Sequence, residues 1–343
     1  MRKALITGIT GQDGAYLSQL LLEKGYKVYG AIRRSSVPNL NRLEALGIAN
    51  NIEYCDLDLT EYNNIFDVVK RTKPDEVYNL AAQSFVATSF AQPIYTAEVD
   101  ALGVTRLLEA LRAMQPEAKF YQASTSEMFG RVQTVPQNEQ TPLYPRSPYG
   151  VAKLYAHWLT INYREAYNMF ATSGILFNHE SPLRGRQFVT RKISLSLAEI
   201  KHGKAETLEL GNMDAKRDWG YAGDYVLGMW KMLQHDTPDT YILATGEMHT
   251  VREFVEKAAI HLGFEIEWQG SGVDEVGIDK KSGNTIVRIN PQFYRPAEVE
   301  QLLGDPAKAK AELQWESETQ FNNLVEMMVE SDYDRVKNGH VPV

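Results

Sequence analysis

The sequence predicts an α/β fold in which a doubly wound parallel sheet is joined by a smaller C-terminal α/β lobe. Apolar runs of strand length alternate with amphipathic stretches through the first half of the chain, and a glycine-rich turn follows the first run. Such alternation is typical of a parallel sheet with helices on both faces. After about residue 178 it loosens into longer loops. A chain of 343 residues, 43% of them hydrophobic, can bury the core that such a fold needs.

Six apolar runs in the first half predict the strands, and helical spacing of apolar residues between them predicts helices. The expected strands are Lys3–Thr7, Lys27–Ile32, Ile52–Cys55, Glu76–Leu80, Lys119–Gln122 and Ala171–Phe177. The expected helices are Tyr16–Lys24, Tyr62–Lys70, Ala101–Met114 and Ala152–Tyr167. Gly25 follows the first helix, where a left-handed cap is favoured.

The loosened pattern predicts a domain boundary. We expect residues 1–178 to form the larger domain, to which some later segments return, and residues 179–343 to form mainly the smaller lobe. Five further helices are expected, near Phe188–His202, Asp224–Gln234, Thr250–Leu262, Pro306–Leu313 and Thr319–Lys337. The segment 270–284 is rich in glycine and charge, so we expect a mobile loop there.

Charge and cysteine content narrow the class of protein. A formal net charge of -8 argues against a nucleic-acid or membrane-surface protein, because both need a positive surface. The single cysteine, Cys55, has no disulfide partner and is expected to be a small buried residue. No apolar run approaches the length of about 20 residues that spans a bilayer. We therefore expect a cytoplasmic protein without nucleic-acid or membrane partners.

The first strand leads into a glycine-rich turn with the spacing GxxGxxG. Glycines there let backbone N–H groups approach a pyrophosphate and let the following helix pack closely on the strand. This position predicts a Rossmann-type dinucleotide site. Its expected residues are Gly8, Thr10, Gly11, Gln12, Asp13 and Gly14.

The end of the second strand indicates which dinucleotide binds. NAD enzymes usually place an acidic residue there, whereas this chain has Arg33, Arg34 and Ser35. Two guanidinium groups suit a 2′-phosphate, which predicts NADP; a solvated basic loop at a subunit contact is the alternative. Further cofactor residues are expected where the third and fourth strands end. They are Asp58, Leu59, Leu80, Ala81, Ala82 and Ser84.

Tyr149 and Lys153 lie four residues apart, so a helix would present both on one face. An ammonium beside the phenol would lower the tyrosine pKa and make Tyr149 a base for a sugar hydroxyl. In isolation this spacing is common on solvated helix faces. Together with the glycine-rich turn, it makes the N-terminal half resemble the short-chain dehydrogenase/reductase family.

Glu127 points to dehydration. It follows Thr125 at the end of the fifth strand, where a simple reductase would offer only a serine or threonine. A ketone at sugar C4 acidifies the C5 proton, and a carboxylate over that carbon can remove it while the C6 hydroxyl leaves as water. The alternative is a surface glutamate at the start of a helix.

Eight strings make the whole chain resemble the GDP-mannose 4,6-dehydratases. They are GITGQDG from Gly8, YNLAAQSFV from Tyr78, FYQASTSEMFG from Phe120, YPRSPYGVAK from Tyr144, LFNHESP from Leu176, FVTRK from Phe188, LGNMDAKRDWG from Leu210 and FYRPAEVE from Phe293. The resemblance implies catalytic roles for Thr125, Glu127, Tyr149 and Lys153. It also implies cofactor contacts from Tyr95, Lys153, His179 and Arg184. Substrate contacts would come from Ser84, Asn178, Lys192, Arg217, Arg295 and Glu298.

The implied reaction converts GDP-mannose to GDP-4-keto-6-deoxymannose and water, with internal hydride transfer from C4 to C6 through bound NADP. Such a product leads to GDP-deoxysugars such as GDP-fucose or GDP-rhamnose. Relatives form homodimers or homotetramers, so we expect one of these, with Arg33–Asn41 near an interface. Leu183 stands where many relatives have a second arginine. His179 lacks partners at metal-ligand spacing, so no metal is expected.

Three alternatives remain open. A nucleotide-sugar reductase or epimerase could use the same tyrosine and lysine, although Glu127 argues against it. A dehydratase of another nucleotide sugar, such as a GDP-heptose or a CDP- or dTDP-hexose, would differ only in its nucleotide and sugar contacts. A catalytically silent NADP-binding sensor would need a degraded catalytic set, and the set is intact.

Overall fold

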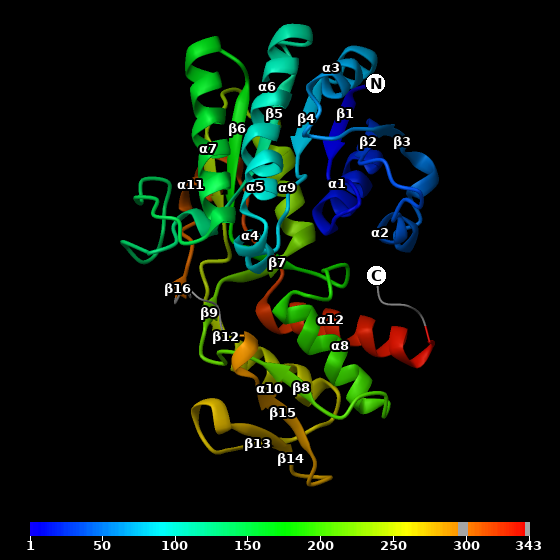
Figure 1. The fold of residues 1–343 in the computed structure, drawn as a ribbon, viewed down its shortest axis with the longest axis vertical. Coiled ribbons are helices and arrows are strands. Elements are labelled where there is room, and N and C mark those ends of the chain that lie inside the picture. The colour runs from blue at the N-terminus through cyan, green and yellow to red at the C-terminus, as the bar shows by residue number, and fades with distance from the viewer. Residues whose placement is uncertain (294–300, 340–343) are drawn as a thin grey trace.

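A seven-stranded parallel sheet forms the larger lobe in the computed structural model, which describes residues 1–293 and 301–339 (Figure 1). The strand order is β11-β6-β5-β4-β1-β2-β3, and every pairing is parallel. The strands are β1 (Lys3–Thr7), β2 (Lys27–Ile32), β3 (Glu53–Asp56), β4 (Glu76–Asn79), β5 (Lys119–Thr125), β6 (Ala171–Leu176) and β11 (Thr240–Leu243). The order reverses beside β1, which confirms the doubly wound fold predicted from the sequence.

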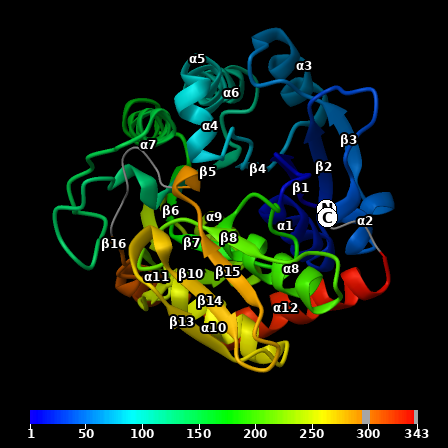
Figure 2. The same ribbon diagram turned by 60° about the horizontal axis from the view of Figure 1, so that its bottom comes forward.

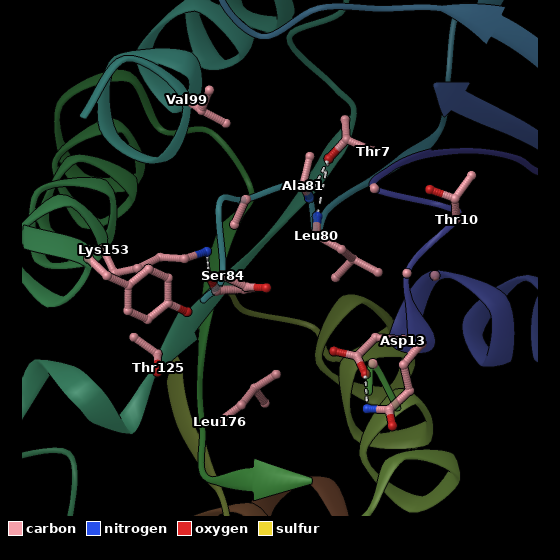
Figure 3. Close-up of a pocket in the computed structure, with 18 of the residues that line it drawn as sticks. Thr7, Thr10, Asp13, Leu80, Ala81, Ser84, Val99, Thr125, Lys153 and Leu176 are labelled. Carbon is pink, nitrogen blue, oxygen red and sulfur yellow. Dashed lines mark hydrogen bonds between the residues drawn. The ribbon is translucent and has the colours of Figure 1, made fainter. Parts of the chain in front are cut away.

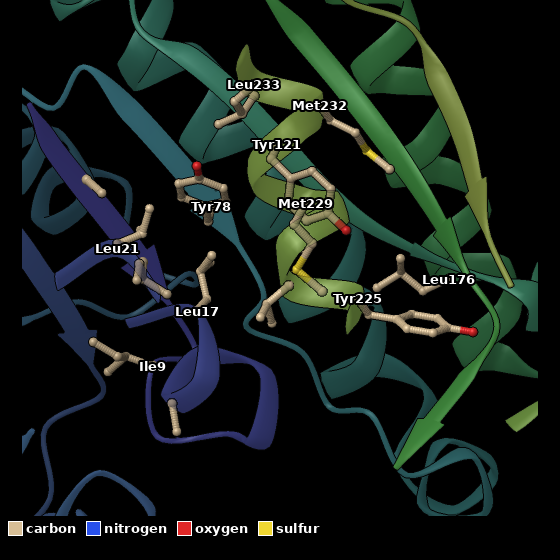
Figure 4. Close-up of a cluster of buried hydrophobic side chains, with 14 of the residues drawn as sticks. Ile9, Leu17, Leu21, Tyr78, Tyr121, Leu176, Tyr225, Met229, Met232 and Leu233 are labelled. Atoms are coloured by element: carbon tan, nitrogen blue, oxygen red, sulfur yellow. The ribbon is translucent and has the colours of Figure 1, made fainter. Parts of the chain in front are cut away.

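Helices cover both faces of this sheet because its strands are apolar on both faces. One face packs on α1 (Gln12–Glu23), α9 (Ala222–Gln234) and α11 (Ala307–Leu313), through a core that includes Leu17, Tyr78 and Met229 (Figure 4). The other face packs on α3 (Tyr62–Thr72), α6 (Gly103–Met114) and α7 (Pro148–Tyr167). Val77 and Tyr78 are neighbours on β4 but belong to opposite cores, as the strand period of two requires.

Local signals in the sequence set the ends of several helices. Ser147 caps α7 by accepting a hydrogen bond from the Gly150 N–H at 3.0 Å. The expected cap at Gly25 is confirmed, since this glycine has a φ of 78°.

Short elements follow the fourth strand: α4 (Val86–Ala91), α5 (Pro93–Ala97) and a π-helical turn (Glu98–Leu102) that leads into α6. The short helix α2 (Asn41–Ala45) lies between β2 and β3.

The smaller lobe lies beyond the carboxyl ends of the parallel strands (Figures 1 and 2). Its helices α8 (Val189–Lys201), α10 (Val251–His261) and α12 (Phe321–Lys337) share one apolar core with a four-stranded sheet. That sheet has the order β13-β14-β15-β8 and comprises β13 (Ile266–Gln269), β14 (Val276–Asp279), β15 (Thr285–Ile289) and β8 (Leu208–Leu210).

The expectation of a loop over residues 270–284 is wrong, because β14 lies within that segment and pairs antiparallel with β13 and β15. Gly277 is one residue that suggested a loop but lies within the strand β14. A Cβ on this residue would lie 2.9 Å from the Trp268 ring, so the glycine lets the ring pack against the strand.

Short strands lie between the two lobes. β7 (Asn178–Glu180) pairs with β10 (Trp219–Tyr221), and β9 (Lys216–Arg217) lies between β12 (His249–Thr250) and β16 (Gln301–Leu302). β11, α9 and α11 follow residue 178 in sequence, yet they belong to the larger lobe. Within the part of the chain that the structure describes, no helix has the length and apolar character needed to cross a membrane.

Candidate active site

A cavity of about 580 Å³ opens at the carboxyl ends of the parallel strands (Figure 3). Its walls come from the segments that follow β1, β2, β3, β4, β5 and β6, and from the start of α7. Ligands of open α/β sheets bind at this edge, beside the point where the strand order reverses.

Most of the site residues expected from the sequence line this one cavity. They are Gly8, Thr10, Gly11, Gln12, Asp13, Gly14, Arg33, Asp58, Leu59, Leu80, Ala81, Ala82, Ser84, Tyr95, Thr125, Glu127, Tyr149, Lys153, Asn178, His179 and Arg184. Four others do not line it: Arg34, Ser35, Lys192 and Arg217. Arg295 and Glu298 lie outside the described residues.

The glycine-rich turn fits a diphosphate. Gly8 has a φ of 68°, and a Cβ there would lie 2.7 Å from the Ala81 nitrogen. Gly14 packs α1 on the turn, since its Cβ would lie 2.5 Å from the Gly8 carbonyl oxygen. Helix α1 begins after Gly11 without a side-chain cap, which leaves its first N–H groups available to an anion at the cavity wall.

Thr7 holds the neighbouring loop in place. Its hydroxyl accepts hydrogen bonds from the N–H groups of Leu80 and Ala81, each at 3.1 Å (Figure 3). It also donates to Asn79 Oδ1 at 2.7 Å. The first and fourth strands are therefore joined where the loop enters the cavity.

Asp13 and His179 form a charged pair beside the first turn of α1. His179 Nε2 lies 2.8 Å from Asp13 Oδ2, and its Nδ1 lies 2.8 Å from the carbonyl oxygen of Phe177. Burial alone would raise the pKa of Asp13, but the charge of His179 and its hydrogen bond outweigh burial and lower it. Burial would lower the pKa of His179, and Asp13 raises it overall. Both shifts favour the charged form of the group, so each side chain helps to keep the other charged.

Two arginines, Arg33 and Arg42, line the cavity beyond the end of β2. Arg33 is exposed and donates to the Tyr95 hydroxyl at 2.6 Å. Arg42 donates to the carbonyl oxygens of Leu183, at 2.7 Å, and Thr10, at 3.1 Å, so it braces the glycine-rich turn. Arg42 was not expected from the sequence, because a lone arginine beyond the Arg33–Arg34 pair carries no motif.

The segment after β7 forms another wall. Arg184 pairs with Glu180 at 2.9 Å and stacks on the Phe188 ring at 3.6 Å. Leu183 is 2% exposed and packs in the core of the larger lobe, so this position contributes no charge to the cavity.

Thr125, Glu127, Tyr149 and Lys153 meet at the end of β5. The Thr125 hydroxyl accepts the Glu127 N–H at 3.2 Å and also hydrogen-bonds Tyr149. Lys153 Nζ donates to the Ala123 carbonyl oxygen at 3.0 Å and lies 5.9 Å from the centre of the Tyr149 ring. The spacing of Tyr149 and Lys153 thus places both side chains in the cavity.

The expectation that Lys153 lowers the pKa of Tyr149 is wrong. The pKa of Tyr149 is raised, chiefly by burial and also by the charge of Asp100, although the hydrogen bond from Thr125 opposes the rise. Burial also lowers the pKa of Lys153. Desolvation favours the neutral form of both groups, and spacing in the sequence carries no information about it.

The remaining positions lie on α8 of the smaller lobe and on β9 between the lobes. Lys192 lies over the Phe293 ring, 3.3 Å from its centre, and Arg217 is buried on β9, where it donates to the Lys216 carbonyl oxygen at 2.8 Å.

Cys55 is buried as expected, and burial raises its pKa to about 11.

Comparisons with known proteins identify the family. Residues 5–328 match the model of the GDP-mannose 4,6 dehydratase family. The chain is 53% identical to the GDP-mannose 4,6 dehydratase of Drosophila melanogaster, covering 98% of this chain and 88% of the relative. It is also 53% identical to the human GDP-mannose 4,6 dehydratase, over 98% and 92% of the two chains.

Solved structures share the fold at low sequence identity. RMD from Pseudomonas aeruginosa, complexed with NADPH, superimposes with a TM-score of 0.78 at 22% identity and covers 98% of this chain and 100% of its own. The dTDP-glucose 4,6-dehydratase DesIV from Streptomyces venezuelae, with NAD and TYD bound, gives 0.82 at 20% identity, over 99% of both chains. On the strength of the full-length sequence matches, this chain belongs to the GDP-mannose 4,6-dehydratase family.

Proposed function

We propose that this chain converts GDP-mannose to GDP-4-keto-6-deoxymannose with loss of water. One observation carries the proposal: Glu127 lines the same cavity as Tyr149 and Lys153. A reductase or epimerase needs the tyrosine and lysine alone, whereas dehydration needs a further base for C5. The named activity of relatives at 53% identity supports the same reaction.

Tyr149 and Glu127 each have a separate proton to move. Tyr149 as phenolate takes the proton of the C4 hydroxyl, with Lys153 as the neighbouring positive charge. Glu127 removes the C5 proton, and the C6 hydroxyl leaves with one proton as water, aided by Thr125. One proton then returns to C5, so the protons balance with loss of a single water. A bound nicotinamide would supply the hydride chemistry, acceptance from C4 and return to C6, and its positive charge would favour the Tyr149 phenolate.

We propose NADP as the resident cofactor. Gly8, Gly11 and the start of α1 would hold its diphosphate, and Arg33 with Arg34 would meet a 2′-phosphate. Arg33 supports this choice because it lines the cavity where an NAD enzyme usually has a carboxylate. Wild-type protein should bind NADP at least about tenfold more tightly than NAD, a difference of roughly 1.4 kcal/mol. Equal affinities, or a preference that survives Arg33→Ala with Arg34→Ala, would remove this assignment.

The substrate contacts remain assignments by family resemblance. Ser84 would contact the substrate. The diphosphate, ribose and guanine would meet Asn178, Lys192, Arg217, Arg295 and Glu298. We also propose a homodimer or homotetramer with the exposed segment after Arg33 near an interface.

Mass spectrometry tests the reaction. Purified protein loaded with NADP and incubated with GDP-mannose should yield a nucleotide sugar lighter by one water. A product of unchanged mass but altered configuration would favour the epimerase alternative. Conversion of another nucleotide sugar in place of GDP-mannose would retain the chemistry and reject the substrate.

A further inference from the structure

A carboxylate with no role in the proposed chemistry lies behind the catalytic pair. Asp100 belongs to the π-helical turn between α5 and α6 and is 1% exposed. The turn packs against α7, the helix that carries Tyr149 and Lys153. Ionisable side chains are rarely buried so completely unless they are paired.

One oxygen of Asp100 holds the cofactor loop. Its Oδ1 accepts the Gln83 N–H at 2.7 Å, and Gln83 lies between cavity residues Ala82 and Ser84. Its Oδ2 is buried and has no hydrogen-bond partner among the residues that the structure describes. Oδ1 therefore holds the loop, and Oδ2 is available to interact with a positive charge.

Lys153 is the positive charge that acts on Asp100. Lys153 is 3% exposed and has one oxygen acceptor, on Ala123, for an ammonium that carries three donors. Burial lowers the pKa of Lys153. The charges of two carboxylates oppose this effect, and the effect of Asp100 is larger than that of Asp13. Burial raises the pKa of Asp100 to about 6, and Lys153 opposes that rise.

Other charged groups on the packed elements are engaged elsewhere. Glu98, on the same turn, pairs with Arg106 of α6 at 2.7 Å. Tyr95 of α5 accepts a hydrogen bond from Arg33. On α7, Tyr149 also lies within the field of Asp100, which raises the pKa of the phenol.

We propose that Asp100 is a positioning residue of this active site: it supplies the buried counter-charge that keeps Lys153 an ammonium, and it fixes the Leu80–Ser84 loop against α7. The inference rests on the proposed roles of Tyr149 and Lys153. Without the carboxylate, a lysine this deeply buried favours its neutral form, which cannot stabilise a phenolate.

A titration without cofactor or substrate tests the pairing directly. Protein labelled with ¹³C at the aspartate carboxyl carbons is titrated by NMR, and the Asp100 signal is assigned by its loss in Asp100→Asn. In Lys153→Met the midpoint of this signal should rise by about one pH unit or more, because the positive charge that opposes the rise in the Asp100 pKa is gone. An unchanged midpoint would overturn the inference.

Kinetics give the second readout. In Asp100→Asn the Gln83 acceptor is retained and the charge is lost, so both limbs of the kcat profile should move to lower pH by about one unit. The KM for GDP-mannose should stay within about threefold. The exposed Asp67→Asn on α3 is the matched control and should leave the profile in place. If the pH profile of Asp100→Asn moves no further than that of Asp67→Asn, the inference is also overturned.

The two proposals fail separately. If wild-type protein does not dehydrate GDP-mannose, the proposed function is wrong, and the NMR midpoint in Lys153→Met still decides whether Asp100 pairs with Lys153. If wild-type protein is active and neither readout moves, only the role of Asp100 is wrong.

Discussion

Removing His179 should destabilise the protein by leaving the half-buried Asp13 carboxylate charged and without its main partner. At 2.8 Å, and with an effective dielectric constant of about 20, the gross attraction of the pair is about 6 kcal/mol. Desolvation of both groups offsets much of this, so we expect a net coupling of about 2 kcal/mol. The single variant His179→Phe should cost about 2–3 kcal/mol, because it leaves a half-buried charge without its main partner. Phenylalanine can keep the ring stacking on Tyr225, whose centre lies 4.7 Å away.

A double-mutant cycle with Asp13→Asn measures the coupling. Asparagine can still accept the Gln12 hydrogen bond, which spans 3.0 Å, so the second change removes mainly the charge. The free energy of unfolding from urea titration should show the double variant about 2 kcal/mol more stable than the sum of the single effects predicts. The affinity for NADP should likewise fall less in the double variant than the single effects predict, since the Asp13 carboxylate without its partner would repel a diphosphate.

The coupling should also depend on pH. The pKa of His179 is raised in the folded state, so its contribution is complete below about pH 6.5 and is lost as pH rises through the folded value. The pKa of Asp13 is lowered, so its contribution is complete above about pH 4 and is lost as pH falls through the folded value. Additive effects at pH 6, or a coupling that is constant from pH 5 to high pH, would refute this reasoning.

Three other changes give distinct results. Glu127→Gln should abolish water loss while C4 oxidation persists, seen as nicotinamide absorbance without the lighter product; normal product formation would reject the role of Glu127. Gly14→Ala places a Cβ 2.5 Å from the Gly8 oxygen and should cost about 1–3 kcal/mol of stability, measured by urea unfolding; Gly11→Ala, with 3.2 Å available, should cost less. Leu183→Arg should lower the melting temperature, because the side chain is buried; an unchanged value would show that the position can open to the cavity.

Most of the larger lobe was predictable from the sequence because its strands are continuous apolar runs and its helices have clear periodicity. β1 and β2 have the predicted bounds, and α7 begins four residues earlier than predicted because Ser147 and Pro148 form its cap and first turn. β11 was not foreseen as a member of this sheet, since nothing in a four-residue strand identifies its neighbours.

The candidate site was predictable where residue type and spacing carry the chemistry. The glycine turn, Glu127 and the Tyr149–Lys153 pair all line the cavity as expected. The raised pKa of Tyr149 was not predictable, because it arises from burial by elements distant in sequence. Asp100 was missed for the same reason: its sequence neighbours indicate an ordinary helix, and only the packed turn places it behind α7.

Isotope transfer tests the central claim most directly. GDP-mannose carrying deuterium at C4 is incubated with NADP-loaded protein, and the product is analysed by NMR. The proposed reaction predicts that the deuterium is recovered at C6 of the 4-keto-6-deoxy sugar. Deuterium found in released NADPH or in solvent, with none at C6, would contradict it.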